Sequence, residues 1–212
     1  MRSFLLFFPC LVPLLIFSQQ TIEDDFEGNG TIAEWVGDNC GIDTSFPNLY
    51  VQGINTSATV LKYTDTGGQY ANIRFDTNEN IDFSVRKTVS FKIYVPSSGL
   101  SGNQDNRVSL KLQDGTLAAP WNTQSEIVKS IYLDQWQEVS FDFENDPYIN
   151  LDPSSDPPTA RTDFNRVLIQ VNGENNNDPV TAFIDDFVFE ESEDHQDEPV
   201  FNTLVWSDEF NG

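Results

Sequence analysis

Residues 88–95 read TVSFKIYV, and this stretch decides the class of fold. Phe91, Ile93 and Val95 alternate with Lys92 and Tyr94. Successive side chains of a β-strand point to opposite faces, so this alternation predicts a strand with one face on a core and the other turned outward.

The same alternation recurs along the chain, and no run has convincing helical periodicity. Turn residues separate the runs, as in Asp65–Gly68 and Asn172-Gly173. About ten strands in roughly 170 residues predict an all-β fold, a two-sheet antiparallel β-sandwich of the jelly-roll type. The clearest runs besides 88–95 are Ala58–Thr64, Gln69–Asp76, Arg107–Gln113, Lys129–Leu133, Gln135–Phe143, Arg166–Asn172 and Ala182–Phe189.

The first 18 residues have the pattern of a secretory signal peptide. Arg2 precedes the apolar run Phe4–Phe17, and Ser18 marks the cleavage point. The alternative is a membrane anchor, but a membrane span needs about 20 apolar residues and this run is shorter. The sequence therefore predicts a secreted or cell-surface protein with no membrane attachment after cleavage.

Three further segments follow the signal peptide 1–18. Residues 19–190 form the predicted sandwich, including the Pro-rich stretch Asn145–Thr162, which we interpret as a surface loop. Residues 191–200 are a predicted acidic linker containing His195, and residues 201–212 begin another domain. We expect a monomer.

The charge of the chain limits its partners. It carries 34 acidic and 11 basic side chains, a formal charge of -23. Nucleic acids and anionic membranes are bound through basic patches, so this composition argues against both. After signal cleavage Cys40 is the only cysteine, which excludes an intramolecular disulfide.

The outward positions of the predicted strands indicate a binding face. They carry amides, basic side chains and tyrosines, which can hydrogen-bond sugar hydroxyls and stack on the C–H faces of sugar rings. Trp121 lies in a predicted loop, where it is either a plug over the core or a sugar platform, whereas Trp136 is expected to pack structurally and Trp35 is ambiguous. The alternative is an ordinary solvated β-face with cross-strand pairs. The candidate carbohydrate-binding residues are Tyr70, Asn72, Arg74, Lys92, Tyr94, Lys111, Gln113, Trp121, Gln170 and Asn172.

Acidic residues near both ends of the predicted domain indicate a metal site. The first and last strands of jelly-roll sandwiches tend to lie side by side, which would gather these carboxylates, and a hard cation such as Ca²⁺ would relieve their repulsion. The alternative is that the acids are merely exposed. The candidate ligands of a structural Ca²⁺ are Asp25, Glu27 and Asp185, with backbone carbonyls as helpers.

The last nine residues, LVWSDEFNG (Leu204–Gly212), resemble the opening strand of glycoside hydrolase family 16 endo-β-1,3-glucanases (laminarinases) of Bacteroidetes. The preceding domain resembles the jelly-roll modules found before such catalytic domains, through DDFEG (Asp24–Gly28), TGGQYANIRF (Thr66–Phe75) and FIDDF (Phe183–Phe187). This resemblance implies a non-catalytic module that binds β-1,3-glucan (laminarin), targets an appended hydrolase to its substrate and contains a structural calcium.

The catalytic motif of that family, E-I-D-x-x-E, does not occur in the 212 residues. This chain is therefore expected to have no hydrolase activity of its own. Two alternatives remain open: a catalytic jelly-roll polysaccharide lyase or hydrolase, in which Tyr or Lys acts as a base, and a structural or adhesive sandwich without a sugar ligand.

Overall fold

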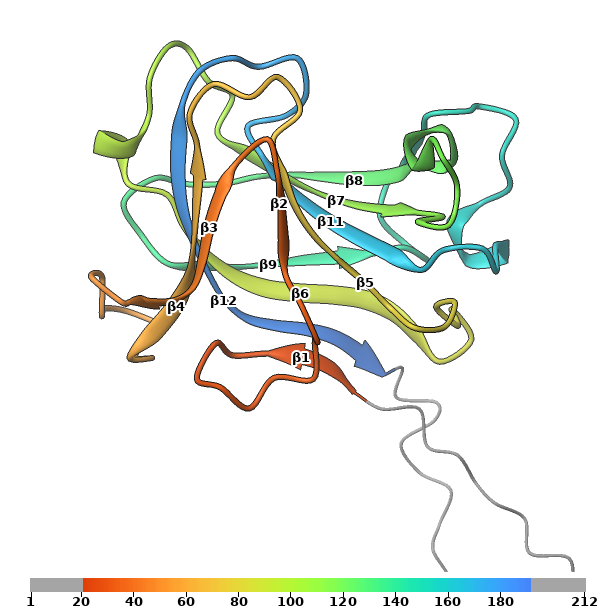
Figure 1. The fold of residues 1–212 in the computed structure, drawn as a ribbon, viewed down its shortest axis with the longest axis horizontal. Coiled ribbons are helices and arrows are strands. Elements are labelled where there is room, and N and C mark those ends of the chain that lie inside the picture. The colour runs from red at the N-terminus through yellow and green to blue at the C-terminus, as the bar shows by residue number, and fades with distance from the viewer. Residues whose placement is uncertain (1–20, 192–212) are drawn as a thin grey trace, which may run out of the picture.

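The computed structural model describes residues 21–191, which form a two-sheet antiparallel β-sandwich (Figure 1). The predicted all-β jelly-roll class is thus confirmed. The predicted signal peptide, the linker from residue 192 and residues 201–212 lie outside the described residues. Within the described range, no helix is long and apolar enough to cross a membrane.

Each sheet has six strands, and we name each sheet after a central strand. The β6 sheet has the order β3-β4-β12-β6-β9, with β1 also paired to β12, and the β7 sheet has the order β10-β8-β7-β11-β5-β2. The β6 sheet consists of β1 (Ile22–Asp24), β3 (Gly41–Pro47), β4 (Thr59–Asp65), β6 (Arg86–Tyr94), β9 (Gln137–Asp142) and β12 (Val180–Glu191). The β7 sheet consists of β2 (Val36–Asp38), β5 (Asn72–Asp76), β7 (Arg107–Gln113), β8 (Ser125–Ser130), β10 (Ile149–Asn150) and β11 (Arg166–Val171). Three short 3-10 helices are η1 (Ser97–Gly99), η2 (Pro120–Thr123) and η3 (Pro158–Ala160).

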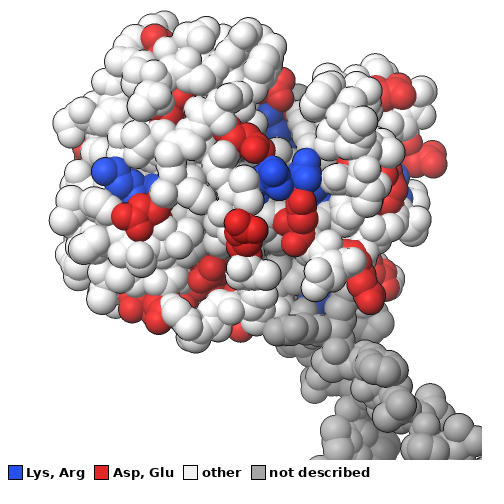
Figure 2. All heavy atoms as spheres, viewed as in Figure 1, with Lys and Arg blue, Asp and Glu red and all other residues white. Residues whose placement is uncertain are grey.

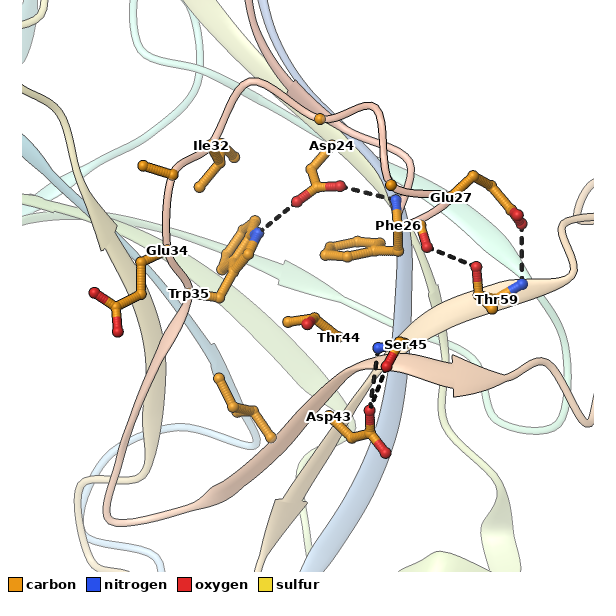
Figure 3. A pocket seen from close by; sticks show the side chains of 14 residues that line it. Asp24, Phe26, Glu27, Ile32, Glu34, Trp35, Asp43, Thr44, Ser45 and Thr59 are labelled. Atoms are coloured by element: carbon orange, nitrogen blue, oxygen red, sulfur yellow. Dashed lines mark hydrogen bonds between the residues drawn. The ribbon is translucent and has the colours of Figure 1, made fainter.

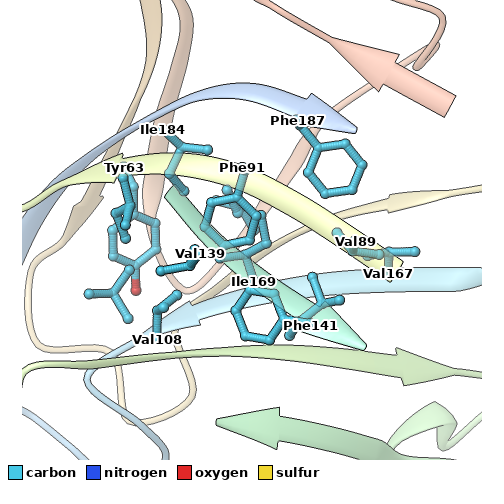
Figure 4. Packing of buried hydrophobic residues seen from close by; sticks show 14 of the residues in the cluster. Tyr63, Val89, Phe91, Val108, Val139, Phe141, Val167, Ile169, Ile184 and Phe187 are labelled. Carbon is cyan, nitrogen blue, oxygen red and sulfur yellow. The ribbon is translucent and has the colours of Figure 1, made fainter. Parts of the chain in front are cut away.

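The core lies between the two sheets and is rich in phenylalanine (Figure 4). Phe91 stacks on Phe141 with ring centroids 5.5 Å apart, and both side chains are buried. Val167 and Ile169 reach the same core from β11. The alternation in the sequence therefore identified the inward-facing residues correctly.

Several strand boundaries differ from the prediction. The run Gln69–Asp76 becomes a strand only at Asn72, because the backbone N–H groups of Gly67 and Gly68 donate to Asp65 Oδ1 and close a turn before it. The predicted strand Lys129–Leu133 is misplaced, since β8 spans Ser125–Ser130 and includes only its first two residues before the chain leaves the sheet. The surface loop Asn145–Thr162 also contributes the short edge strand β10.

The outer face of the β6 sheet is covered by the loop between β3 and β4. Tyr50 from this loop stacks on Tyr94 with centroids 4.2 Å apart and accepts a 2.7 Å hydrogen bond from Trp136 Nε1 at its carbonyl oxygen. Val60 and Phe183 complete this second apolar cluster. Trp136 is thus a packing residue, as expected from the sequence.

Candidate functional site

The outer face of the β7 sheet, here called the β7 face, lies between two groups of loops. One group consists of the loops before β5 and β7 and the loop after β11. The other group consists of η2 and the long segment between β9 and β11. Both groups rise on the same side of the sheet, at opposite ends of its strands (Figure 1). Figure 2 shows the surface hollowed between them, with basic and acidic atoms close together in the hollow.

Strand register brings six of the predicted binding residues onto the β7 face. Leu168 pairs with Arg74 on one side and Lys111 on the other, and Ile73 pairs with Ile169, which places Asn72 beside Gln170. Alternation adds Gln113 on β7 and Asn172 after β11. Tyr70 lies in the loop before β5 and Trp121 lies in η2.

Lys92 and Tyr94 do not belong to this set, so the expectation of one shared face needs correction. Both lie on β6, on the outer face of the opposite sheet. Tyr94 is buried beneath the β3–β4 loop, and Lys92 Nζ forms an ion pair with Asp186. Alternation reports which residues share one side of a strand, and it carries no information on which sheet the strand joins.

A buried ammonium group organises the centre of the β7 face. Lys111 is only 1 % exposed, and its Nζ donates to Gln170 Oε1 at 2.7 Å and to Glu174 Oε1 at 2.5 Å. Glu174 Oε1 also accepts from Gln124 Nε2 at 3.3 Å, and Gln124 Oε1 accepts from Gln113 Nε2 at 2.8 Å. Burial is the largest single influence and opposes ionisation of Glu174, but the hydrogen bond and charge of Lys111 together with the hydrogen bond from Gln124 outweigh it and hold the pKa of Glu174 below its ordinary value.

The arginines at the β5 side of the face are also paired. Arg166 holds Asp76 with two hydrogen bonds, 2.6 and 2.8 Å long, and Arg74 Nε lies 2.8 Å from Asp38 Oδ2. The hydrogen bond from Arg166 lowers the pKa of Asp76, which keeps that carboxylate ionised. These pairs cross-link β2, β5 and β11 beside the floor of the hollow.

Four buried polar atoms on the β7 face have no hydrogen-bond partner among the described residues. One is Arg107 Nε, and the other three form a row: Asn72 Oδ1, Ser109 Oγ and Gln170 Nε2, on residues that are 9 %, 2 % and 1 % exposed. Ser109 pairs directly with Gln170, so the three atoms belong to neighbouring strands β7, β11 and β5. A buried polar group without a partner costs about 1–3 kcal/mol, so this row favours a hydrogen-bonding occupant.

Exposed aromatic side chains stand at both ends of these strands. Trp121 is 56 % exposed, and Tyr70 is 46 % exposed with its hydroxyl donating to Asn175 Oδ1 at 2.9 Å. Of the two, Tyr70 is adjacent to the unpaired row, because Asn72 Nδ2 donates to its carbonyl oxygen. Exposed rings combined with unpaired polar groups suit a ligand that has apolar faces and hydroxyl edges.

The three predicted metal ligands have separate partners. Glu27 Oε1 accepts backbone hydrogen bonds from Ala58 and Thr59, and Asp25 Oδ1 accepts from the backbone of Glu27. Asp185 is fully buried and accepts from Asn55 Nδ2 at 2.5 Å. In residues 21–191, no group of three acidic, His or Cys side chains is arranged to hold a metal.

Of the three, Asp185 has the environment that a cation would stabilise. Burial raises the pKa of Asp185 to about 6, with the neighbouring carboxylate of Asp186 adding to the effect. The expected pairing of the first and last strands is confirmed, because β1 pairs with β12 through Asp24 and Phe187. Asn55 presents its amide nitrogen to Asp185, while its amide oxygen accepts from Asn48 Nδ2 and the Ser57 backbone.

A separate cavity of 940 Å³ opens between the β1–β2 segment and β3 (Figure 3). Asp24 accepts from Trp35 Nε1 and from the Phe26 backbone, both at 2.9 Å, and thereby anchors this segment. Trp35 packs edge-on against Phe187 in the core. Trp35 is therefore structural, which resolves its ambiguity in the sequence.

Sequence reasoning missed Ser109, Gln124 and Glu174 on the β7 face. The alternation of β7 places Ser109 on the same side as Lys111, so its signal was present in the sequence. Glu174 contacts Lys111 across 63 positions from a loop, and no local pattern indicates such a contact.

The sequence matches no family model and no curated protein among those compared. Solved structures share its fold. The family 11 carbohydrate-binding module of the Clostridium thermocellum cellulosomal cellulase Lic26A-Cel5E aligns with a TM-score of 0.52 at 15 % identity, over 80 % of this chain and 92 % of that one. An agarase aligns with a TM-score of 0.50 at 8 % identity, over 80 % of this chain and 24 % of that one. A family 29 carbohydrate-binding module aligns with a TM-score of 0.47 at 12 % identity, over 80 % of this chain and 85 % of that one.

Proposed function

We propose that the β7 face binds polysaccharide without cleaving it. The observation that carries this proposal is the row of unpaired, buried polar atoms on Asn72, Ser109 and Gln170. Sugar hydroxyls both donate and accept hydrogen bonds, so one sugar chain can satisfy an amide oxygen, a hydroxyl and an amide N–H together. The fold is also that of a family 11 carbohydrate-binding module, which is consistent with this role.

The geometry favours binding of a chain that crosses the strands. Neighbouring strands are about 4.8 Å apart, so β5, β11, β7 and β8 together offer a floor of roughly 15 Å. Trp121 and Tyr70 stand on the two walls of this floor and supply apolar surface for sugar rings. An internal segment of a polysaccharide suits such a site better than a chain end does.

A purely binding role also agrees with the interactions of the Lys and Tyr side chains, which are the groups that a lyase could use as a base. Lys111 Nζ is ion-paired with Glu174, and the Tyr70 hydroxyl donates to Asn175 Oδ1, so both groups are already engaged. Burial raises the pKa of Tyr94, which opposes formation of its phenolate. We therefore prefer a binding module over a catalytic jelly roll.

The resemblance of Leu204–Gly212 to family 16 laminarinases supplies the finer part of the proposal. The ligand is then β-1,3-glucan, and the module is a secreted, monomeric unit that keeps an appended hydrolase on its substrate. Its structural calcium would be held by Asp185, with Asp25, Glu27 and backbone carbonyls nearby. The calcium would stabilise the fold and would not contact sugar.

Affinity electrophoresis of the full chain in gels containing laminarin, xylan, agarose or alginate tests the proposal. We expect retardation in laminarin with no release of oligosaccharides. Trp121→Ala should weaken binding about tenfold, the effect of losing about 1.4 kcal/mol of stacking. Tyr132→Ala is the matched control, because Tyr132 is exposed but lies in the connection between β8 and β9. Migration unchanged in all four gels would refute sugar binding.

A further inference from the structure

The β7 face places a positive charge where a polysaccharide would lie. Lys111 points outward from β7, yet it is 1 % exposed because neighbouring side chains surround it. Its Nζ contacts Gln170, which belongs to the unpaired row, so the charge lies within the floor of the site. An uncompensated ammonium at this position would attract carboxylate or sulfate groups of a ligand.

Two carboxylates flank Lys111, and they differ in distance and position. Glu174 Oε1 is 2.5 Å from Nζ, whereas Glu126 Oε1 is 4.0 Å away. Glu126 belongs to β8 and is mostly buried, while Glu174 extends from the β11–β12 loop with 37 % of its side chain exposed. Glu174 is therefore the partner that both neutralises Lys111 and meets an incoming ligand.

The other basic side chains of the β7 sheet are neutralised in the same way. Arg74 and Arg166 pair with Asp76, Arg107 pairs with Asp105, and Lys129 pairs with Asp146. Glu174 thus completes a pattern in which each Lys and Arg on the strands of the β7 sheet has a carboxylate partner. The face offers hydrogen bonds to a ligand but no net positive charge.

We propose that Glu174 determines the charge specificity of the β7 face by masking Lys111, so that the face accepts neutral polysaccharides and rejects polyuronates and sulfated glycans. This inference rests on the proposed function and names the substrate class of the same site. Glu174 repels an anionic ligand, and by pairing with Lys111 it also neutralises the cation that could attract one. Both effects disfavour binding of anionic glycans, and both weaken with added salt.

Glu174→Gln is the decisive variant. The amide keeps the size of the side chain and an oxygen that accepts from Lys111, but removes the charge. We expect wild type to bind laminarin and not alginate, and the variant to gain alginate binding by at least tenfold at 20 mM salt. This gain should disappear at 0.5 M salt and in the double variant Lys111→Met/Glu174→Gln.

Glu144→Gln is the matched control. It removes the same charge from a carboxylate that pairs with Lys87 on β6, in the opposite sheet. It should leave alginate binding undetected, which separates masking of Lys111 from the general effect of net charge. Circular dichroism and melting of each variant confirm folding, and Glu174→Ala replaces Glu174→Gln if the latter fails to fold.

The outcomes separate this inference from the proposed function. If wild type binds neither laminarin nor any other neutral glycan, the proposed function fails. If wild type binds laminarin but Glu174→Gln gains no alginate binding, or if wild type already binds alginate, the assignment of Glu174 is wrong and sugar binding stands.

Discussion

Raising the pH in the presence of a chelator should expose the free-energy cost of burying Asp185. Its carboxyl group is fully buried, and burial raises its pKa from an ordinary value of 3.8 to about 6. Between these two values the folded state binds more protons than the unfolded state, so stability falls as the pH rises. The destabilisation is near zero well below pH 4, grows between the two pKa values and reaches about 3 kcal/mol well above pH 6.

Other carboxylates titrate in the same range, so the measurement must isolate Asp185. Urea unfolding in a chelator should be followed at several pH values between 4 and 8, for wild type and for Asp185→Asn. The amide cannot ionise, and any constant cost of its altered hydrogen bonds with Asn55 cancels in the pH dependence. We expect the variant to gain about 2 kcal/mol relative to wild type between pH 4 and pH 7.

Calcium provides the second half of the test. If the ion binds at Asp185, saturating calcium should stabilise wild type above pH 6 and leave Asp185→Asn unchanged. A difference between the two proteins that stays constant from pH 4 to pH 8 in chelator would refute the burial argument. An unchanged wild-type melting temperature on chelation would refute the calcium site.

Three further predictions concern the anchors beside the two faces. Trp35→Phe leaves the buried Asp24 carboxylate without the indole N–H and should cost about 2 kcal/mol in urea unfolding; no loss would show that this bond does not hold the β1–β2 segment. Gly30→Ala places a Cβ 2.5 Å from the Asp24 carboxyl group and should act on the same bond, so the double variant should lose less than the sum of the single losses. Arg166→Lys loses the two-point contact with Asp76, and the pKa of Asp76 measured by NMR should rise toward its ordinary value; an unchanged titration would assign the shift to Arg74 instead.

The fold could be predicted because its core depends on a local pattern. The inward positions of β6, β7 and β11 follow from alternation alone, and the structure buries all of them. The limits of β5 and β8 could not be predicted, because they depend on where turns such as Asp65–Gly68 close. The coverage of the β6 sheet by the β3–β4 loop depends on contacts far apart in the chain.

Only those residues of the candidate site that lie on β-strands could be predicted from the sequence. Asn72, Lys111 and Gln170 share the β7 face as expected, since alternation and sheet pairing act together there. Lys92 and Tyr94 were placed with them because a period of two does not identify the sheet. Glu174 was missed because loop residues have no period, although its charge decides the electrostatics of the floor.

The pairing of β1 with β12 has a mechanical consequence. Ile22 at the start of β1 lies opposite Phe189 near the end of β12, so both ends of the sandwich emerge at the same place. Tension between the segments that flank the sandwich would load the hydrogen bonds of this pair one after another, starting at that end. The three residues of β1 would detach first, and the strands behind them would carry little of the load. The β7 sheet would be loaded only after β1 has detached, through its edge strand β2.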